Sequence, residues 1–167
     1  ETGHAVWSAR KILAGCSFAV INADDFYGPD TFSELIRAFS TRENEAGPLD
    51  CSMVGFLLRD TLSEHGTVSR GICKTNERRL LSSVEEWTEI KLFNQEISGK
   101  NSAGELSRLT GDEIVSMNVW AFSATIFPYL GIQFSAFLKT HSDSLSSEFY
   151  LPFAVDCLLY TSDAADE

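Results

Sequence analysis

The stretch Ser17-Phe18-Ala19-Val20-Ile21-Asn22-Ala23-Asp24-Asp25-Phe26-Tyr27-Gly28 decides the fold class. Its apolar first part, residues 17–23, is typical of a buried central strand, and two adjacent carboxylates follow it. In open α/β sheets, ligands bind beyond the carboxyl ends of such strands. A carboxylate placed there can hold Mg²⁺, a hard cation that takes oxygen ligands and keeps substrate phosphates in its shell. A second interpretation is as good on spacing alone: Asp24 and Asp25 form a turn and cap the next helix.

The segments on either side of this stretch alternate between helix and strand patterns. Helices are predicted over residues 3–13, 30–39 and 125–138 and from residue 146 onward. Strands are predicted over residues 53–58, 68–74, 80–86, 89–93 and 114–122, with an exposed Gly/Ser-rich loop over 98–104. This order predicts an α/β sandwich with a mixed sheet.

The composition excludes several classes of protein. The 167 residues suffice for one domain, and 44% hydrophobic with 22% charged residues is typical of a soluble globular chain. Thirteen Lys+Arg against 24 Asp+Glu give a net charge of −11, so a nucleic-acid partner is not expected. No apolar run approaches the ~20 residues of a membrane span, so no membrane partner is expected either. The four cysteines form no CxxC pair, which favours reduced thiols in a cytoplasm over a zinc site.

Both ends of the sequence have the pattern of a piece of a longer protein. The first residue is Glu1, and a helix pattern begins directly after it. Residues 157–167 resemble the translation of a transposase-type sequencing adapter, although a natural frayed terminus is the alternative. We therefore expect one domain over residues 1–156, incomplete at both ends, and a non-native tail over 157–167.

Two further segments offer polar groups to a ligand. Residues 66–71 contain two glycines and Arg70, which could bind an anion, but the segment is more typical of the start of a hairpin. Asn118 lies within an apolar strand pattern, where its amide needs partners. It could contact a sugar hydroxyl or serve as a structural polar bridge.

Several segments, taken together and in this order, resemble a bacterial group of sugar-phosphate nucleotidyltransferases, the NDP-sugar pyrophosphorylase-like enzymes of the NTP-transferase family. The resemblance extends over residues 2–156, and the segments that carry it are Thr2-Gly3-His4-Ala5-Val6, Val20 to Gly28, Gly66 to Gly71, Val115-Ser116-Met117-Asn118-Val119-Trp120 and Ser147-Glu148-Phe149-Tyr150-Leu151-Pro152. It implies a Rossmann-like mixed-sheet sandwich of the GT-A-like type. It also implies an enzyme that uses Mg²⁺ to join a nucleoside triphosphate and a sugar 1-phosphate into an NDP-sugar, with release of pyrophosphate.

The resemblance also implies roles for individual residues. Gly3 matches a glycine that lies against the nucleobase, with His4 and Ala5 beginning the helix beside it. Asp24 matches the aspartate that binds the catalytic Mg²⁺ between the nucleotide and the sugar phosphate. Sugar-contacting positions of the family are matched by Gly71, Glu86 and Asn118.

The sequence departs from the family pattern in two functional places. The family begins with a glycine-rich loop ending in Arg and followed by Lys, which cradles the triphosphate, and this chain contains no such loop. A second metal-binding aspartate of the family has no counterpart after Pro152. We therefore expect the 167-residue chain itself to be inactive. Two alternatives stay open: a non-catalytic module that binds nucleotide sugars, and a metal-dependent glycosyltransferase that consumes them. The base, the sugar and the oligomeric state do not follow from the sequence.

Overall fold

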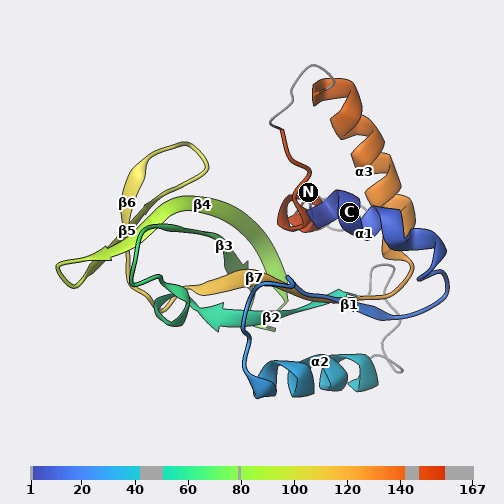
Figure 1. Ribbon diagram of the computed structural model, residues 1–167, viewed down its shortest axis with the longest axis horizontal. Helices are drawn as coiled ribbons and strands as arrows, with labels where there is room; N and C mark the ends of the chain where they lie inside the picture. The colour runs from blue at the N-terminus through green and yellow to red at the C-terminus, as the bar shows by residue number, and fades with distance from the viewer. Residues whose placement is uncertain (1, 42–50, 79, 142–146, 157–167) are drawn as a thin grey trace. The chain divides into compact units, whose positions relative to one another are not determined.

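The computed structural model describes residues 2–41, 51–78, 80–141 and 147–156 (Figure 1). The chain divides into two compact units. Unit 1 comprises Glu1–Val54 and Asn118–Ala154, and unit 2 comprises Gly55–Met117 and Val155–Glu167. No helix in the described part of the chain is long and apolar enough to cross a membrane.

Unit 1 contains helices and a short antiparallel pair of strands, formed by β1 and the end of β7. Its elements are α1 (Thr2–Ser8), the 3-10 helix η1 (Ala9–Lys11), β1 (Phe18–Val20), α2 (Pro29–Thr41), the start of β2 (Cys51–Leu57), the end of β7 (Ile114–Phe122) and α3 (Ile126–His141). Phe18 of β1 lies opposite Phe122 of β7, and its ring also stacks on Phe127 with the centroids 5.2 Å apart. In Figure 1, α1 and α3 lie on one side of β1 and α2 lies on the other.

Unit 2 is built from successive antiparallel strands. Its elements are the end of β2, the 3-10 helix η3 (Leu58–Thr61), β3 (Val68–Thr75), β4 (Leu81–Phe93), β5 (Glu96–Lys100), β6 (Leu106–Leu109) and the start of β7. β3 pairs with β7 on one side and with β4 on the other, and β5 and β6 continue the row. One face carries the hydrophobic core of this unit, formed by Leu58, Ile72, Ile90, Ile97, Leu109 and Val115.

The predicted α/β class is confirmed, with two changes in unit 2. The strands predicted over 80–86 and 89–93 form the single strand β4, which continues through an irregularity between Thr88 and Lys91 where Glu89 takes a left-handed conformation (φ 53°). The predicted loop over 98–104 was partly wrong, because its first residues belong to β5. Gly99 allows this strand to pass close to β4: a Cβ atom there would lie 2.8 Å from Ile90 Cγ1.

The sheet also differs from the prediction. Every strand pair whose register the structure describes is antiparallel: β1–β7, β3–β4, β3–β7, β4–β5 and β5–β6. The parallel pairs expected in a mixed sheet are not among them. β1, predicted as a central strand, lies at the end of the strand order. Its apolar composition reflects the packing of Phe18 rather than burial of the whole strand, since Ala19 is exposed.

Candidate functional site

Gly71 lies between two polar residues on the neighbouring strands of unit 2. In the strand registers, Gly71 of β3 lies opposite Glu86 of β4 and opposite Ser116 of β7. Directly opposite residues on antiparallel strands point to the same face of a sheet. A Cβ atom at Gly71 would lie 3.5 Å from Ser116 Cβ and 3.7 Å from Glu86 Oε2. Two of the predicted sugar-binding residues, Gly71 and Glu86, are therefore neighbours. We call Ser116, Gly71 and Glu86 the Gly71 row.

Glu86 is the ionisable residue of the Gly71 row. The residue as a whole is exposed, but the protein atoms gathered around the carboxyl group desolvate it and raise its pKa. The nearby Arg70 guanidinium lowers the pKa of Glu86 by a smaller amount. A carboxylate in such a setting is a strong acceptor for ligand hydroxyl groups.

Ser116 is a member of the Gly71 row that the sequence analysis did not single out. The residue is 5% exposed. Its position could have been suspected, because a serine in an otherwise apolar strand pattern must satisfy a buried hydroxyl group. Beside it, burial raises the pKa of the Cys73 thiol to about 12, although a hydrogen bond from the Ser116 backbone to the sulfur counteracts this. The buried Cys73 thiol therefore keeps its proton at neutral pH.

Arg70 is engaged within the protein. Its Nε donates to Thr61 Oγ1 at 3.1 Å and its Nη2 donates to the Thr61 carbonyl oxygen at 2.7 Å. These bonds tie η3 to β3. The segment over residues 66–71 leads into β3, as the hairpin interpretation predicts.

The two aspartates that follow β1 have different surroundings. Asp25 Oδ2 accepts from Asn22 Nδ2 at 2.9 Å and from the Tyr27 hydroxyl at 3.2 Å, and that hydroxyl accepts from the Asn22 backbone N–H at 3.0 Å. Asp25 thus closes the loop over residues 22–27. Asp24 is exposed, and no described residue forms a hydrogen bond or ion pair with its carboxylate. The turn interpretation therefore applies to Asp25.

The closed loop also changes the acidity of Tyr27. Burial, together with the negative charges of Asp25 and Asp24, raises the pKa of Tyr27 to about 12, although the hydrogen bond from Asn22 counteracts this. Tyr27 therefore keeps its proton at neutral pH and can donate to Asp25.

The predicted nucleotide-binding residues of α1 lie in unit 1. The Gly3 backbone N–H donates to the Phe149 carbonyl oxygen at 3.0 Å, and a Cβ atom at Gly3 would lie only 2.7 Å from Phe149 Cδ1. His4 is exposed and stacks on Phe134 with the centroids 4.8 Å apart, and Ala5 is exposed. Among the described residues, no hydrogen bond or ring contact joins these three positions to Asp24.

Asn118 has an unusual backbone conformation. It lies within β7 with a φ angle of 60°, in the left-handed region that asparagine tolerates better than most residues. It is half-buried and begins the part of β7 that belongs to unit 1. The strand conformation therefore changes at this residue. The left-handed backbone conformation is one reason for an asparagine at this position.

The residues present are compatible with a magnesium ion that is shared with a substrate. In the described residues there is no group of three or more His, Cys, Asp or Glu side chains that could hold a metal. Mg²⁺ is commonly held by one or two carboxylates plus substrate phosphates and water. The Asp24 carboxylate, exposed and without a described partner, fits such a shared shell.

Comparison of the sequence with models of known protein families finds no match, and comparison with curated proteins finds none either. The chemistry of the residues and the resemblance described above therefore carry the functional argument.

Proposed function

We propose that this chain carries the sugar- and metal-binding residues of a cytoplasmic sugar-1-phosphate nucleotidyltransferase with a GT-A-like fold. Such an enzyme joins a nucleoside triphosphate and a sugar 1-phosphate into an NDP-sugar and pyrophosphate. The observation that supports the proposal best is the Gly71 row, because two residues expected to contact the sugar are register partners with an acceptor carboxylate 3.7 Å from the glycine's Cβ position.

The reaction needs positioning and charge neutralisation more than a protein nucleophile. One phosphate oxygen attacks the α-phosphorus in line while pyrophosphate leaves, so the protein must hold both phosphates and offset their charge. In the proposal, Glu86 accepts sugar hydroxyl groups and the Gly71 backbone contacts the sugar. Asp24 would hold Mg²⁺, which neutralises phosphate charge when bound. Exposed His4 and Ala5 would contact the nucleotide, and Asn118 the sugar.

The test is calorimetric titration of the full chain, in the presence of Mg²⁺, with a panel of UDP-, dTDP-, GDP-, ADP- and CDP-hexoses. We expect one nucleotide sugar to bind, and Glu86→Gln to weaken its binding at least about tenfold, since a hydrogen bond to a charged group is lost. Glu89→Gln is the matched control, because Glu89 lies on the same strand and pairs with Lys100 at 2.6 Å. Absence of binding across the panel, or an equal loss in both variants, would contradict the proposal.

A nucleotide-sugar-binding module without catalysis is the second candidate. Such a module would use the Gly71 row but would not need to neutralise a triphosphate. A pyrophosphate-release assay with Mg²⁺, nucleoside triphosphate and sugar 1-phosphate separates the two. We expect this chain to release none, and measurable release would instead establish catalysis by the residues present.

A further inference from the structure

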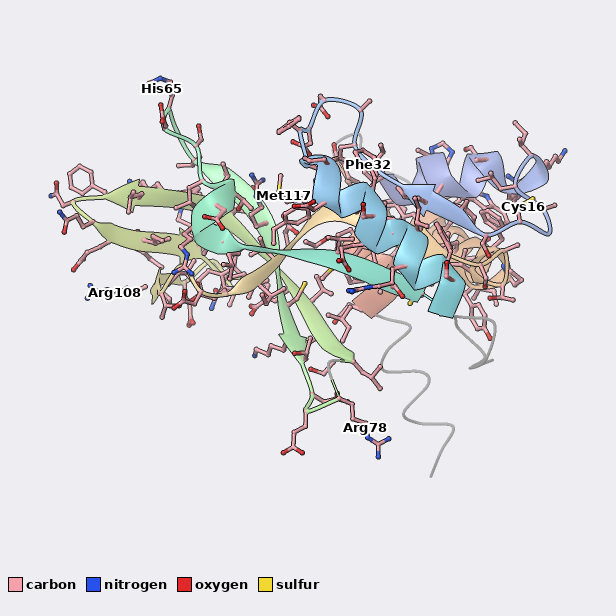
Figure 2. The ribbon with its side chains drawn as sticks, turned by 90° about the horizontal axis from the view of Figure 1, so that it is seen from below. Cys16, Phe32, His65, Arg78, Arg108 and Met117 are labelled. Atoms are coloured by element: carbon pink, nitrogen blue, oxygen red, sulfur yellow. The ribbon has the colours of Figure 1, made fainter. Side chains whose placement is uncertain are left out.

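The loop that joins β1 to α2, residues 21–28, is anchored in the protein through Tyr27. Within this loop, which the structure describes throughout, only Tyr27 is buried. Its carbonyl oxygen accepts from Thr31 Oγ1 at 2.6 Å, and Thr31 is itself buried on α2. Figure 2 shows Phe32, the next residue, near the start of this helix. Tyr27 is therefore fixed both by its ring and by its backbone.

The hydroxyl group of Tyr27 connects the residues on either side of Asp24. It accepts from the Asn22 backbone N–H at 3.0 Å and donates to Asp25 Oδ2 at 3.2 Å. Asn22 Nδ2 donates to the same Asp25 oxygen at 2.9 Å. We call Asn22, Asp25 and Tyr27 the Tyr27 network. Because Asp24 lies between Asn22 and Asp25 in the chain, the network restricts the backbone conformations that are open to Asp24.

The same hydrogen bonds give the two neighbouring carboxylates different tasks. Asp25 Oδ2 accepts two hydrogen bonds, and a cation bound there would have to compete with both donors. The Asp24 side chain is exposed and is not a member of the Tyr27 network. Mg²⁺ requires a near-ideal octahedral arrangement of its ligands. A carboxylate on a preordered backbone meets this requirement at a smaller entropic cost than one on an open loop.

We propose that Tyr27 is a positioning residue for a divalent cation at Asp24. Its hydroxyl group, through Asn22 and Asp25, holds the Asp24 backbone in the conformation that binds the ion, although Tyr27 itself does not touch the ion. The inference rests on the proposed function, in which Asp24 holds Mg²⁺. It follows that removal of a single hydroxyl group, with no change in charge, weakens metal binding.

The test uses Mn²⁺ alone, a paramagnetic ion that takes the same kinds of oxygen ligand as Mg²⁺. In the full chain, backbone amide NMR signals of residues 23–26 should broaden over a Mn²⁺ series, and Asp24→Ala should abolish this. Tyr27→Phe should need at least about tenfold more Mn²⁺ for the same broadening, because binding must then also order the loop. Tyr129→Phe, on α3 of the same unit, is the matched control and should behave like the wild type.

The variant Asp25→Asn separates positioning from simple charge attraction. An asparagine Oδ1 can still accept from Tyr27 and Asn22, but one negative charge beside Asp24 is lost. In an exposed loop, that charge should change the Mn²⁺ affinity by no more than about threefold. Positioning therefore predicts a larger loss in the charge-neutral Tyr27→Phe than in Asp25→Asn, whereas attraction by charge predicts the opposite order.

Tyr27→Phe keeps the buried ring and is expected to fold, which circular dichroism checks. Asn22→Ala, which removes one donor to Asp25, provides the same comparison if it does not, and should weaken Mn²⁺ binding by a smaller factor.

The possible outcomes distinguish this inference from the proposed function. If Asp24→Ala abolishes the broadening but Tyr27→Phe and Asn22→Ala match Tyr129→Phe, the positioning role is overturned and Asp24 stays the ligand. A greater loss in Asp25→Asn than in Tyr27→Phe would also overturn the positioning role. No broadening in the wild type, or broadening that persists in Asp24→Ala, would instead contradict the metal site of the proposed function, and the role of Tyr27 with it.

Discussion

Gly3 and Gly71 are both too crowded for a side chain, but different atoms crowd them. At Gly3, an added Cβ would meet the ring of Phe149 and, at 2.9 Å, the Phe149 carbonyl oxygen. At Gly71, it would meet one methyl group of Val84 at 2.9 Å, with Ser116 and the Glu86 carboxylate beyond. The first glycine allows the chain to pack against its own backbone. The second is crowded by a side-chain atom, which can move more easily.

This difference separates a structural glycine from a candidate binding glycine. A backbone atom cannot move aside without moving its whole segment, whereas a valine methyl group can rotate or be removed. Substitutions at the two positions should therefore differ in what they damage, with stability lost at Gly3 and ligand affinity lost at Gly71.

The largest expected effect is that of Gly3→Val. The new side chain collides with Phe149, so the free energy of unfolding should fall by about 2–3 kcal/mol, the upper range for overpacking. Ala5→Val, on the exposed side of the same helix, is the control and should cost less than about 1 kcal/mol. Urea unfolding monitored by circular dichroism measures both. Equal losses in the two variants would mean that Phe149 does not crowd Gly3 in the way described.

A smaller loss of stability is expected for Gly71→Ala, about 1 kcal/mol, because only the Val84 methyl group must give way. Adding Val84→Ala should relieve the collision, so the two substitutions should couple favourably in a double-mutant cycle. Nucleotide-sugar affinity should stay low in the double variant, because the methyl group introduced by Gly71→Ala still lies beside the Glu86 carboxylate and covers the Gly71 backbone. Restored affinity would show that Gly71 acts only through packing.

The two aspartates after β1 extend the comparison to side chains. Asp25→Ala removes the acceptor that closes the loop and should cost about 1 kcal/mol of unfolding free energy. Asp24→Ala should stay within about 0.5 kcal/mol of the wild type, since no described residue bonds its carboxylate. Magnesium-dependent nucleotide-sugar binding should be lost in Asp24→Ala. A stable but binding-competent Asp24→Ala variant would exclude Asp24 as the metal ligand.

The smallest expected effect is a loss of stability at alkaline pH, which is absent at neutral pH. Folding raises the pKa of Tyr27 from 10.0 to about 12 and that of Cys73 from 9.0 to about 12. The folded state therefore holds these protons more tightly, so their stabilising contribution is complete below pH 9 and is lost as the pH rises to 12. Thermal unfolding between about pH 8 and pH 11 should show a falling midpoint. The slope should be shallower in the double variant Tyr27→Phe/Cys73→Ala, and an unchanged slope would contradict this origin.

Sequence patterns predicted where the strands and helices lie better than they predicted which strands pair with each other. The strand over residues 114–122 matches β7 at both ends, because a long apolar run with β-branched residues has few alternatives. β5 was missed because its Gly and Ser residues resemble a loop, and only the close approach to Ile90 explains Gly99 there. The Gly71–Glu86 pairing depends on irregularities between Val68 and Arg70, which shift the register without a local sequence signal.

In the candidate site, too, the sequence indicated which residues to consider but not what they contact. The motif around Asp24 drew attention to both aspartates, but the hydrogen bonds from Asn22 and Tyr27 to Asp25 distinguish their surroundings. Gly3 was assigned by resemblance alone, and its contact with Phe149 joins residues far apart in the sequence. Such long-range contacts leave no local pattern from which they could be predicted.

The way in which unit 1 is assembled from two separated stretches has a consequence for how the chain folds. Residues 1–54 must wait for residues 118–154, since β1 has its described partner only in the second half of β7. The β4–β5 and β5–β6 hairpins need only neighbouring residues and can form much earlier. During synthesis, the hairpins should be in place while β1 is still an apolar ribbon without a partner. In pulse-labelled refolding, amides of β4 and β5 should therefore become protected before those of β1. The chain should need a chaperone most before β1 has paired, and less once the fold is complete.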